Sequence, residues 1–328
     1  MNESNAPRAL LIAPKYFDYE NDIATELTRQ GMQVDMLPDR PFNTPFKKAA
    51  LRFRPELGHR RSTRFFLDSV ERLGRTHYNI IIVVQGEGMT VEVLDSLRQH
   101  YRTAKFVFYM WDSIENKPFA KRQLPHYDRV STFDPIDAKK YGMHNRPLFF
   151  EPGFDRTARQ EFAYDLSFIG TVHSDRYRII KSLVGQLQPD TKTYIYCFLQ
   201  APWMYDARRL FSNTVKGAKR SEFHFHPLSK DAVQATFFGS RAVLDIEHPN
   251  QRGVTMRTIE ALGSRTKMIT TNATVRSMDF YDPQNVLLID RNHPKLDPHF
   301  LRTPYREVPE EIRQRYSLRR WVKDVCGQ

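Results

Sequence analysis

The sequence is poor in cysteine, with only Cys197 and Cys326 among its 328 residues. Two isolated cysteines provide neither the clustered thiols of a zinc site nor the framework of a disulfide-stabilised domain. Long apolar runs are also missing, because no stretch approaches the roughly 20 residues that a membrane-spanning helix needs. Residues 1–8 are polar and short, unlike a secretory signal. These absences predict a cytoplasmic protein in a reducing compartment.

Acidic residues are outnumbered, since 38 Asp and Glu face 50 Lys and Arg, for a formal net charge of +12. Such an excess predicts an anionic partner, which can be nucleic acid, an acidic membrane surface or a phosphorylated small molecule. A nucleic-acid-binding protein is therefore one alternative function. The sequence lacks a recognition helix, an RNP-like motif and a zinc motif, so we expect no nucleic-acid partner.

Short apolar runs alternate with helix-like segments along the whole chain. Ile80 to Val84 is a continuous β-branched run, typical of a strand that is covered on both faces. Further strands are expected at 9–13, 33–37, 105–110, 128–132, 166–169, 193–198, 222–225, 242–246, 267–271 and 286–289. Strands that alternate with helices predict the α/β class with parallel sheets.

The length predicts two domains. We place the boundary in the irregular segment around Pro152 and Gly153, which gives an N-terminal domain over 1–155 and a C-terminal domain over 156–308. Residues 309–328 are expected to form a final amphipathic helix. This helix either packs on its own domain or crosses back to the N-terminal one.

The strongest motif follows an apolar strand that ends near Ile246. A polar loop containing Gly253 leads into a helix that starts near Thr255 and contains Glu260. The free N–H groups and positive dipole end of a helix start suit a diphosphate. An alternative interpretation is a capped helix with Arg257 and Glu260 as a surface pair.

This segment and its continuation, Lys267 to Asn272, resemble the donor-site motif in the C-terminal half of GT-B glycosyltransferases. The resemblance is closest to capsule, exopolysaccharide and lipopolysaccharide biosynthesis proteins and to spore-maturation-protein-like glycosyltransferases. Tyr164 to Thr171 is similar to the first strand and turn of that half. The resemblance implies a GT-B fold, with two Rossmann-like parallel-sheet domains facing across a cleft. The first would bind the acceptor and the second the nucleotide sugar.

The resemblance also implies roles for single residues. Glu260 matches the glutamate that holds the donor ribose, and Thr255 and Met256 match the backbone amides that face the diphosphate. Arg257 is a candidate clamp for the phosphates. Many relatives carry a second glutamate, but Gly253 stands seven residues before Glu260. The sequence therefore leaves open whether transfer retains or inverts the sugar's configuration.

A second turn runs from Gly170 to Arg176. Gly170 allows close approach of the backbone, and His173 and Arg176 are candidates to contact phosphate oxygens. Ser174 or Asp175 can equally serve only as a helix cap.

The segment from Phe223 to Ser229 lies where GT-B relatives place the loop that contacts the nucleobase. Its histidines, His224 and His226, lack the further ligands of a metal site. We expect no metal and no cofactor beyond the nucleotide-sugar co-substrate, because the resemblance implies a metal-independent enzyme.

Two carboxylates follow strands of the N-terminal half, and either can act as the general base toward the acceptor hydroxyl. Glu87 lies between two glycines after Val84, and Asp112 follows the strand that ends at Met110. In the alternative, Asp112 caps a helix and Glu87 is solvated.

The segment from Arg40 to Arg64 is the most basic in the chain. It is a candidate site for a lipid-diphosphate acceptor or an anionic leaflet, or it is a solvated loop. Together these features predict a glycosyltransferase with a polysaccharide or lipid-linked oligosaccharide acceptor in surface glycan biosynthesis, with peripheral association at the inner face of the cell membrane. A non-catalytic GT-B-like partner subunit is the alternative. The donor sugar and base, the acceptor and the oligomeric state stay open.

Overall fold

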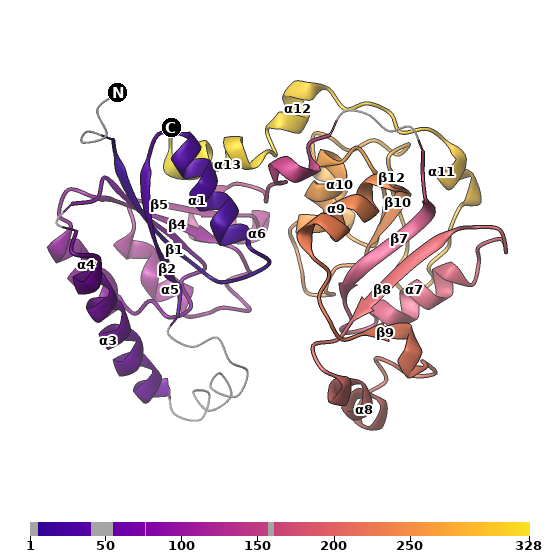
Figure 1. Ribbon diagram of the computed structural model, residues 1–328, viewed down its shortest axis with the longest axis horizontal. Helices are drawn as coiled ribbons and strands as arrows, with labels where there is room; N and C mark the ends of the chain where they lie inside the picture. The colour runs from indigo at the N-terminus through magenta and orange to yellow at the C-terminus, as the bar shows by residue number, and fades with distance from the viewer. Residues whose placement is uncertain (1–5, 41–54, 76, 157–160) are drawn as a thin grey trace. The chain divides into compact units, whose positions relative to one another are not determined.

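The computed structural model of the chain describes residues 6–40, 55–75, 77–156 and 161–328, and side chains are not described at 55–60. The chain forms two compact units, shown in Figure 1. Unit 1 comprises Met1–Pro147 and Leu318–Gln328, and unit 2 comprises Leu148–Ser317. The division follows Pro147, whereas the sequence-based boundary is residue 155. Residues just after Pro147 belong to unit 2 because Phe154 packs edge-on against Phe237, with ring centroids 5.3 Å apart.

Unit 1 is built on a six-stranded parallel sheet with the order β2-β1-β3-β4-β5-β6. Its strands are β1 (Arg8–Ala13), β2 (Gln33–Pro38), β3 (Ile80–Val84), β4 (Lys105–Met110), β5 (Arg129–Thr132) and β6 (His144–Asn145). All five residues of β3 are buried, as the continuous apolar run predicts for a central strand.

The helices of unit 1 follow these strands along the chain. They are α1 (Tyr19–Arg29), α3 (Pro55–Leu73), α4 (Val91–His100), α5 (Ala120–Gln123), the 3-10 helix η2 (Leu124–His126) and α6 (Pro135–Tyr141). Their apolar faces and the sheet form one core that includes Phe66, Leu94 and Phe106.

Unit 2 is built on a second six-stranded parallel sheet, with the order β12-β11-β10-β7-β8-β9. Its strands are β7 (Tyr164–Thr171), β8 (Thr193–Phe198), β9 (Phe223–His224), β10 (Ser240–Asp245), β11 (Lys267–Thr270) and β12 (Val286–Leu288). Its α-helices are α7 (Arg176–Val184), α8 (Pro202–Phe211), α9 (Lys230–Phe238), α10 (Met256–Gly263), α11 (Pro298–Arg302) and α12 (Glu310–Gln314), and its 3-10 helices are η3 (Pro152–Phe154), η4 (Arg220–Glu222) and η5 (Ala273–Ser277).

The strand order of unit 2 is the doubly wound order in which the chain first moves outward from β7 and then restarts at β10 on the other side. Ligands in such sheets bind outside the carboxyl ends of the strands where the order reverses. That point lies between β7 and β10, and its position follows from topology alone. The predicted α/β class with two Rossmann-like units is confirmed.

The end of the chain departs from the single predicted helix. Helix α12 ends at Gln314, and a separate helix, α13, covers Leu318–Cys326. Between them the carbonyl of Tyr316 accepts a hydrogen bond from the Phe150 amide at 2.9 Å. Helix α13 belongs to unit 1, where Trp321 is buried and meets Tyr109 edge-on at 4.7 Å.

Candidate functional site

Two turns meet at the point in unit 2 where the strand order reverses. One runs from Gly170, near the end of β7, to Arg176, the first residue of α7, and the other follows β10 and leads into α10. Because β7 and β10 are hydrogen-bonded parallel neighbours, their carboxyl ends lie side by side. The structure therefore brings together the two turns that the sequence singled out separately.

Asp245, the last residue of β10, anchors the start of α10. Its carboxylate is fully buried and accepts hydrogen bonds from the hydroxyls of Thr255, at 2.8 Å, and Thr258, at 2.6 Å. Thr255 is the N-cap, since its hydroxyl oxygen accepts from the Thr258 amide at 3.1 Å. These bonds fix the start of α10 to the end of β10. The positive end of the helix dipole therefore lies at the carboxyl edge of the sheet.

Arg257 lies on this anchored helix and reaches back to β7. Its Nη1 donates to Asp245 at 3.3 Å and its Nη2 to the carbonyl of Ile169 at 2.5 Å. A Cβ added to Gly170 would lie only 2.8 Å from this Nη2. Gly170 therefore leaves room for this guanidinium, which would have to shift to accommodate a larger residue. The alternative of an exposed Arg257–Glu260 surface pair is wrong, because Glu260 is buried and Arg257 pairs with Asp245.

A second guanidinium, that of Arg176, lies beside the first. It is buried and donates to the carbonyls of Ile246 and Thr171, both at 2.6 Å. Burial and the nearby charge of Arg257 lower the pKa of Arg176 to about 9. Two neighbouring cations in a poorly solvated place repel each other, and a bound anion would relieve that repulsion.

His173 lies on the same turn as Arg176 and faces the second loop. Its ring lies 5.3 Å from that of His248, centroid to centroid, and its Nδ1 is 3.0 Å from the Ser174 hydroxyl. Burial, and then the charge of Arg176, lower the pKa of His173 to about 3. The imidazole is therefore neutral at physiological pH. Arg208 of α8 donates to the carbonyl of Val172 and adds a further positive charge.

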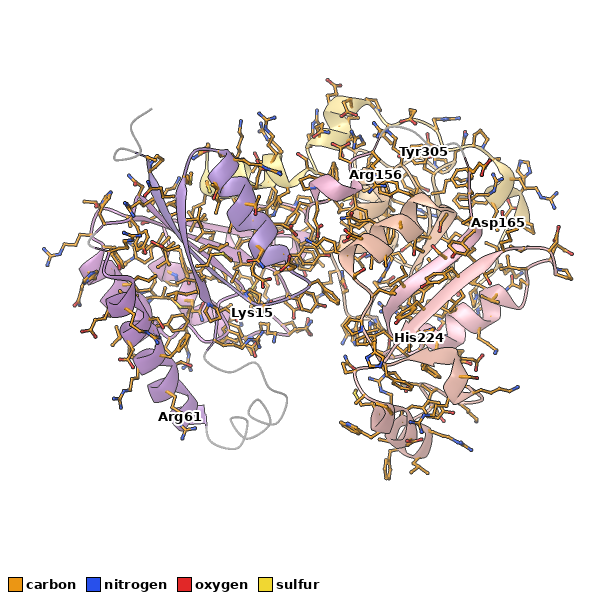
Figure 2. The ribbon with its side chains drawn as sticks, in the orientation of Figure 1. Lys15, Arg61, Arg156, Asp165, His224 and Tyr305 are labelled. Carbon is orange, nitrogen blue, oxygen red and sulfur yellow. The ribbon has the colours of Figure 1, made fainter. Side chains whose placement is uncertain are left out.

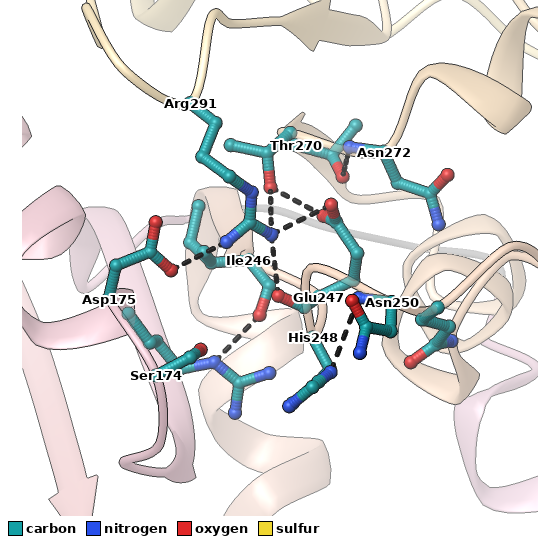
Figure 3. Close-up of polar contacts among 12 residues, drawn as sticks. Ser174, Asp175, Ile246, Glu247, His248, Asn250, Thr270, Asn272 and Arg291 are labelled. Carbon is teal, nitrogen blue, oxygen red and sulfur yellow. Dashed lines mark hydrogen bonds and ion pairs between the residues drawn. The ribbon is translucent and has the colours of Figure 1, made fainter. Parts of the chain in front are cut away.

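A carboxylate–arginine network lies next to these groups (Figure 3). Arg291, which follows β12, donates to Asp175 at 2.6 Å and to the Glu247 carboxylate at 2.8 Å. Glu247 also accepts from the Thr271 hydroxyl. Asp175 occupies the N-cap position of α7, as one interpretation predicted, but its side chain makes no cap bond and its carboxylate binds Arg291 instead. Ser174 does not cap α7 either and has a left-handed φ of 45°.

The other predicted donor residues lie on the same helix or its loop. Glu260 is 7% exposed in the second turn of α10, and Met256 is its first residue. The Gly253 carbonyl accepts from the Asn272 side chain at 3.0 Å, which ties the loop to the end of β11. His224 is an exposed residue of β9 (Figure 2), and its ring stacks on that of Tyr196 at 3.9 Å.

In unit 1, Glu87 and Asp112 follow the neighbouring strands β3 and β4. Glu87 is not merely solvated, because its carboxylate pairs with Arg40 at 2.7 Å and with Lys117 at 3.1 Å. Asp112 accepts from the Ser113 amide at 2.8 Å and from Asn116 at 2.9 Å. Asp112 is therefore the less heavily neutralised of the two candidate bases.

No protein-family model and no curated protein sequence matches the chain. Solved structures do. Sucrose-phosphate synthase from Thermosynechococcus elongatus is similar over 98% of both chains, at 12% identity and a TM-score of 0.61. HepE from Anabaena, in complex with UDP-glucose, is similar over 98% of this chain and 99% of its own, at 11% identity and a TM-score of 0.61. A glycosyltransferase from Rickettsia africae is similar over 98% of this chain and 97% of its own, at 10% identity and a TM-score of 0.58.

The chain has the GT-B fold. Unit 2 is the C-terminal half of this fold. Arg176 and Arg257 lie where its strand order reverses. Sequence reasoning missed Asp245, Glu247, His248, Arg291 and Arg208 as members of this group. The rule that ligands bind at strand ends would have found Asp245 and Arg291, which end or follow strands. Arg208 carries no such signal, because α8 brings it to the loop.

Among the described residues, no group of three or more His, Cys, Asp or Glu side chains is placed to hold a metal ion. Within the same part of the chain, no helix is long and apolar enough to cross a membrane. The basic segment from Arg40 to Arg64 lies largely outside the described residues. Its described members include Arg40, which pairs with Asp39 and Glu87, and Arg61, which is exposed on α3 (Figure 2).

Proposed function

We propose that this protein is a glycosyltransferase that moves a sugar from a nucleotide-diphosphate donor to a polysaccharide or a lipid-linked oligosaccharide in surface glycan biosynthesis. The observation that carries the proposal is the pair of guanidiniums, Arg176 and Arg257, that lie on either side of Gly170 beside the start of α10. An arginine pair at a helix N-terminus is matched to a diphosphate, because both supply directed N–H donors and positive charge.

These groups would also serve the reaction. The leaving diphosphate gains negative charge as the glycosidic bond to the sugar breaks, and fixed positive groups stabilise that charge. Arg176, Arg257 and the amides at the start of α10 are assigned this role, so the proposed transfer needs no metal ion. Glu260 is assigned to the donor ribose, and the segment Phe223 to Ser229 to the base.

A uridine nucleotide is the first donor to test, because HepE, which shares the fold, is described in complex with UDP-glucose. For the acceptor side we assign Asp112 as the general base in preference to Glu87. A carboxylate that already pairs with two cations is a poor proton acceptor, and Glu87 pairs with Arg40 and Lys117.

The test is calorimetric titration of the protein with nucleoside monophosphates, nucleoside diphosphates and UDP-sugars. We expect a diphosphate to bind more tightly than its monophosphate. Arg257→Lys, which keeps a charge near Asp245 but loses the fork, should weaken diphosphate binding about tenfold or more, because charge-assisted hydrogen bonds contribute about 1.5–3 kcal/mol. Arg241→Lys, on the exposed start of β10, is the matched control and should bind normally.

Turnover separates the enzyme from the alternative of a non-catalytic GT-B-like subunit. The assay follows release of the free nucleotide from a bound donor in the presence of membrane-derived glycan acceptors. Asp112→Asn should lower turnover without changing donor affinity, while Glu87→Gln should lower it less. Donor binding without turnover on any acceptor would favour the partner-subunit function, and equal affinity for diphosphate and monophosphate would refute the assigned site.

A further inference from the structure

Helix α8 exposes an apolar face to solvent. Trp203, Leu210 and Phe211 are 67%, 75% and 86% exposed, higher fractions than for any other large hydrophobic side chain among the described residues. Residues at positions i, i+7 and i+8 lie on one side of a helix. The three side chains therefore form a single patch, which we call the α8 face.

The opposite side of α8 is fixed to unit 2. Tyr205 is buried, donates from its hydroxyl to the Ala218 carbonyl at 2.8 Å and packs 5.2 Å from the ring of Phe223 on β9. Arg208 donates to the Val172 carbonyl. Because these contacts set the rotation of the helix, the α8 face cannot turn inward without breaking them. Figure 1 shows α8 at the end of unit 2, beyond β9.

Basic residues are frequent in α8 and in the segment that follows it. From Pro202 to Arg220 the sequence contains five Lys and Arg and one acidic residue, Asp206. Arg209, Lys216, Lys219 and Arg220 are exposed. The single acid is 3.7 Å from Arg220 in an exposed pair, which leaves most of the positive charge uncompensated.

We propose that the α8 face docks on an anionic lipid bilayer, with the three apolar side chains in the headgroup region and the basic ones on lipid phosphates. Interfacial helices that lie on membranes combine an apolar face with Lys and Arg, and Trp is enriched at that depth. A protein partner or a second copy of this chain would cover the apolar side chains equally well. The excess of positive charge beside them, however, favours an anionic surface.

The proposal does not rest on the proposed function, and it concerns a surface other than the Arg40 to Arg64 segment of unit 1. It has a consequence for the site, because Arg208 joins α8 to Val172, next to His173. Docking through α8 would hold the loop after β7 close to the lipid headgroups.

The test is sedimentation of the full chain with two kinds of vesicle. One contains phosphatidylcholine alone, and in the other about one lipid in three is the anionic phosphatidylglycerol. We expect binding only to the anionic vesicles. Arg209→Gln, Lys216→Gln and Lys219→Gln together should reduce it on the order of 100-fold, since each basic residue contributes about fivefold. Trp203→Ser, Leu210→Ser and Phe211→Ser together should reduce it about tenfold or more.

Three controls keep the outcome interpretable. Leu67→Ser with Ile136→Ser removes exposed apolar side chains from unit 1 and should leave vesicle binding unchanged. The tryptophan emission of the chain should shift to shorter wavelength when anionic vesicles are added, and this shift should be absent from the Trp203→Phe variant. Thermal unfolding of each variant checks that it is folded.

The proposal is overturned if folded α8 variants bind vesicles as well as the parent chain, since another surface then docks. It is also overturned if the parent chain ignores anionic vesicles. A dimer that dissociates when Trp203, Leu210 and Phe211 are replaced, seen by light scattering, would assign the α8 face to a second copy instead.

Discussion

Gly170→Ala tests whether the arginine pair shapes the loop after β7. Gly170 lies in β7 without a left-handed φ, so alanine fits its backbone, and such a change alone would stabilise by about 0.4–1 kcal/mol through the unfolded chain. The new Cβ would lie 2.8 Å from Arg257 Nη2, 3.0 Å from Phe168 Cζ and 3.5 Å from Arg176 Nη1. Ordinary contact begins near 3.4 Å, so the Arg257 nitrogen must retreat by about 0.6 Å.

That retreat strains the bonds of Arg257 to Ile169 and Asp245, which are 2.5 and 3.3 Å long. Overpacking typically costs about 1–3 kcal/mol. The restriction of the unfolded chain by alanine offsets part of this cost. We therefore expect Gly170→Ala to lower the free energy of unfolding by about 1–2 kcal/mol. Diphosphate affinity should fall about tenfold, because the guanidinium that would bind the phosphates is displaced.

The assay is urea unfolding in a double-mutant cycle with Arg257→Ala. Removing the arginine removes the closest contact, so Gly170→Ala should cost about 1 kcal/mol less in that background. An equal cost in both backgrounds would mean that the strain comes from the contact with Phe168 and not from the contact with Arg257. Gly185→Ala, at the end of α7, is the matched control. Its Cβ would meet backbone oxygens at 3.3 and 3.7 Å, and we expect a change within about 0.5 kcal/mol.

Four further changes test the remaining features. The pKa of His173 is about 3 in the folded chain and about 6.5 when unfolded, so its neutral form contributes stability above pH 6.5 that is lost as the pH falls toward 3. The free energy of unfolding should fall between pH 7 and pH 5, and His173→Gln should make this fall about 1–2 kcal/mol smaller, measured by urea titrations at both pH values. An equal fall in the variant would contradict the assigned pKa. Thr255→Val should destabilise by about 1–2 kcal/mol in the same assay, because α10 loses its cap, whereas Thr255→Ser should not. Glu260→Ala should weaken nucleotide binding in calorimetry without unfolding the chain, and unchanged affinity in a folded variant would remove Glu260 from the ribose site. Trp321→Ala should lower the free energy of unfolding by about 3–5 kcal/mol, since the side chain is fully packed in unit 1; a cost below about 1 kcal/mol would show that α13 is dispensable.

Most of the strands and the class of fold could be predicted from the sequence. Apolar runs such as Ile80–Val84 predicted strands that the structure contains, because a strand buried on both faces must be apolar throughout. The turns at Gly170 and Gly253 were also identified, because a glycine between a strand and a helix is a local signal. The two-residue strand β6 was missed, since His144–Asn145 is too short and polar to give one.

Local pattern did not determine the last helix. Ile312, Tyr316, Trp321 and Val322 continue one amphipathic period, yet the chain breaks between α12 and α13. At the break the Tyr316 carbonyl accepts a hydrogen bond from the Phe150 amide, which belongs to a residue far away in the sequence. A periodic pattern predicts which side of a helix is apolar. It does not predict whether that side packs on one hydrophobic core or is divided between the cores of two units.

The pairing of charges at the site could not be predicted from the sequence. Asp245 ends β10, Glu247 and Arg291 follow β10 and β12, and Arg176 and Arg257 stand at the starts of α7 and α10. The strand order sets which of these groups meet. Glu87, which the sequence left either exposed or catalytic, is held by Arg40 and Lys117. The physical reason is that hydrophobic periodicity is a property of neighbours along the chain, whereas an ion pair depends on distances that exist only after the sheet has formed.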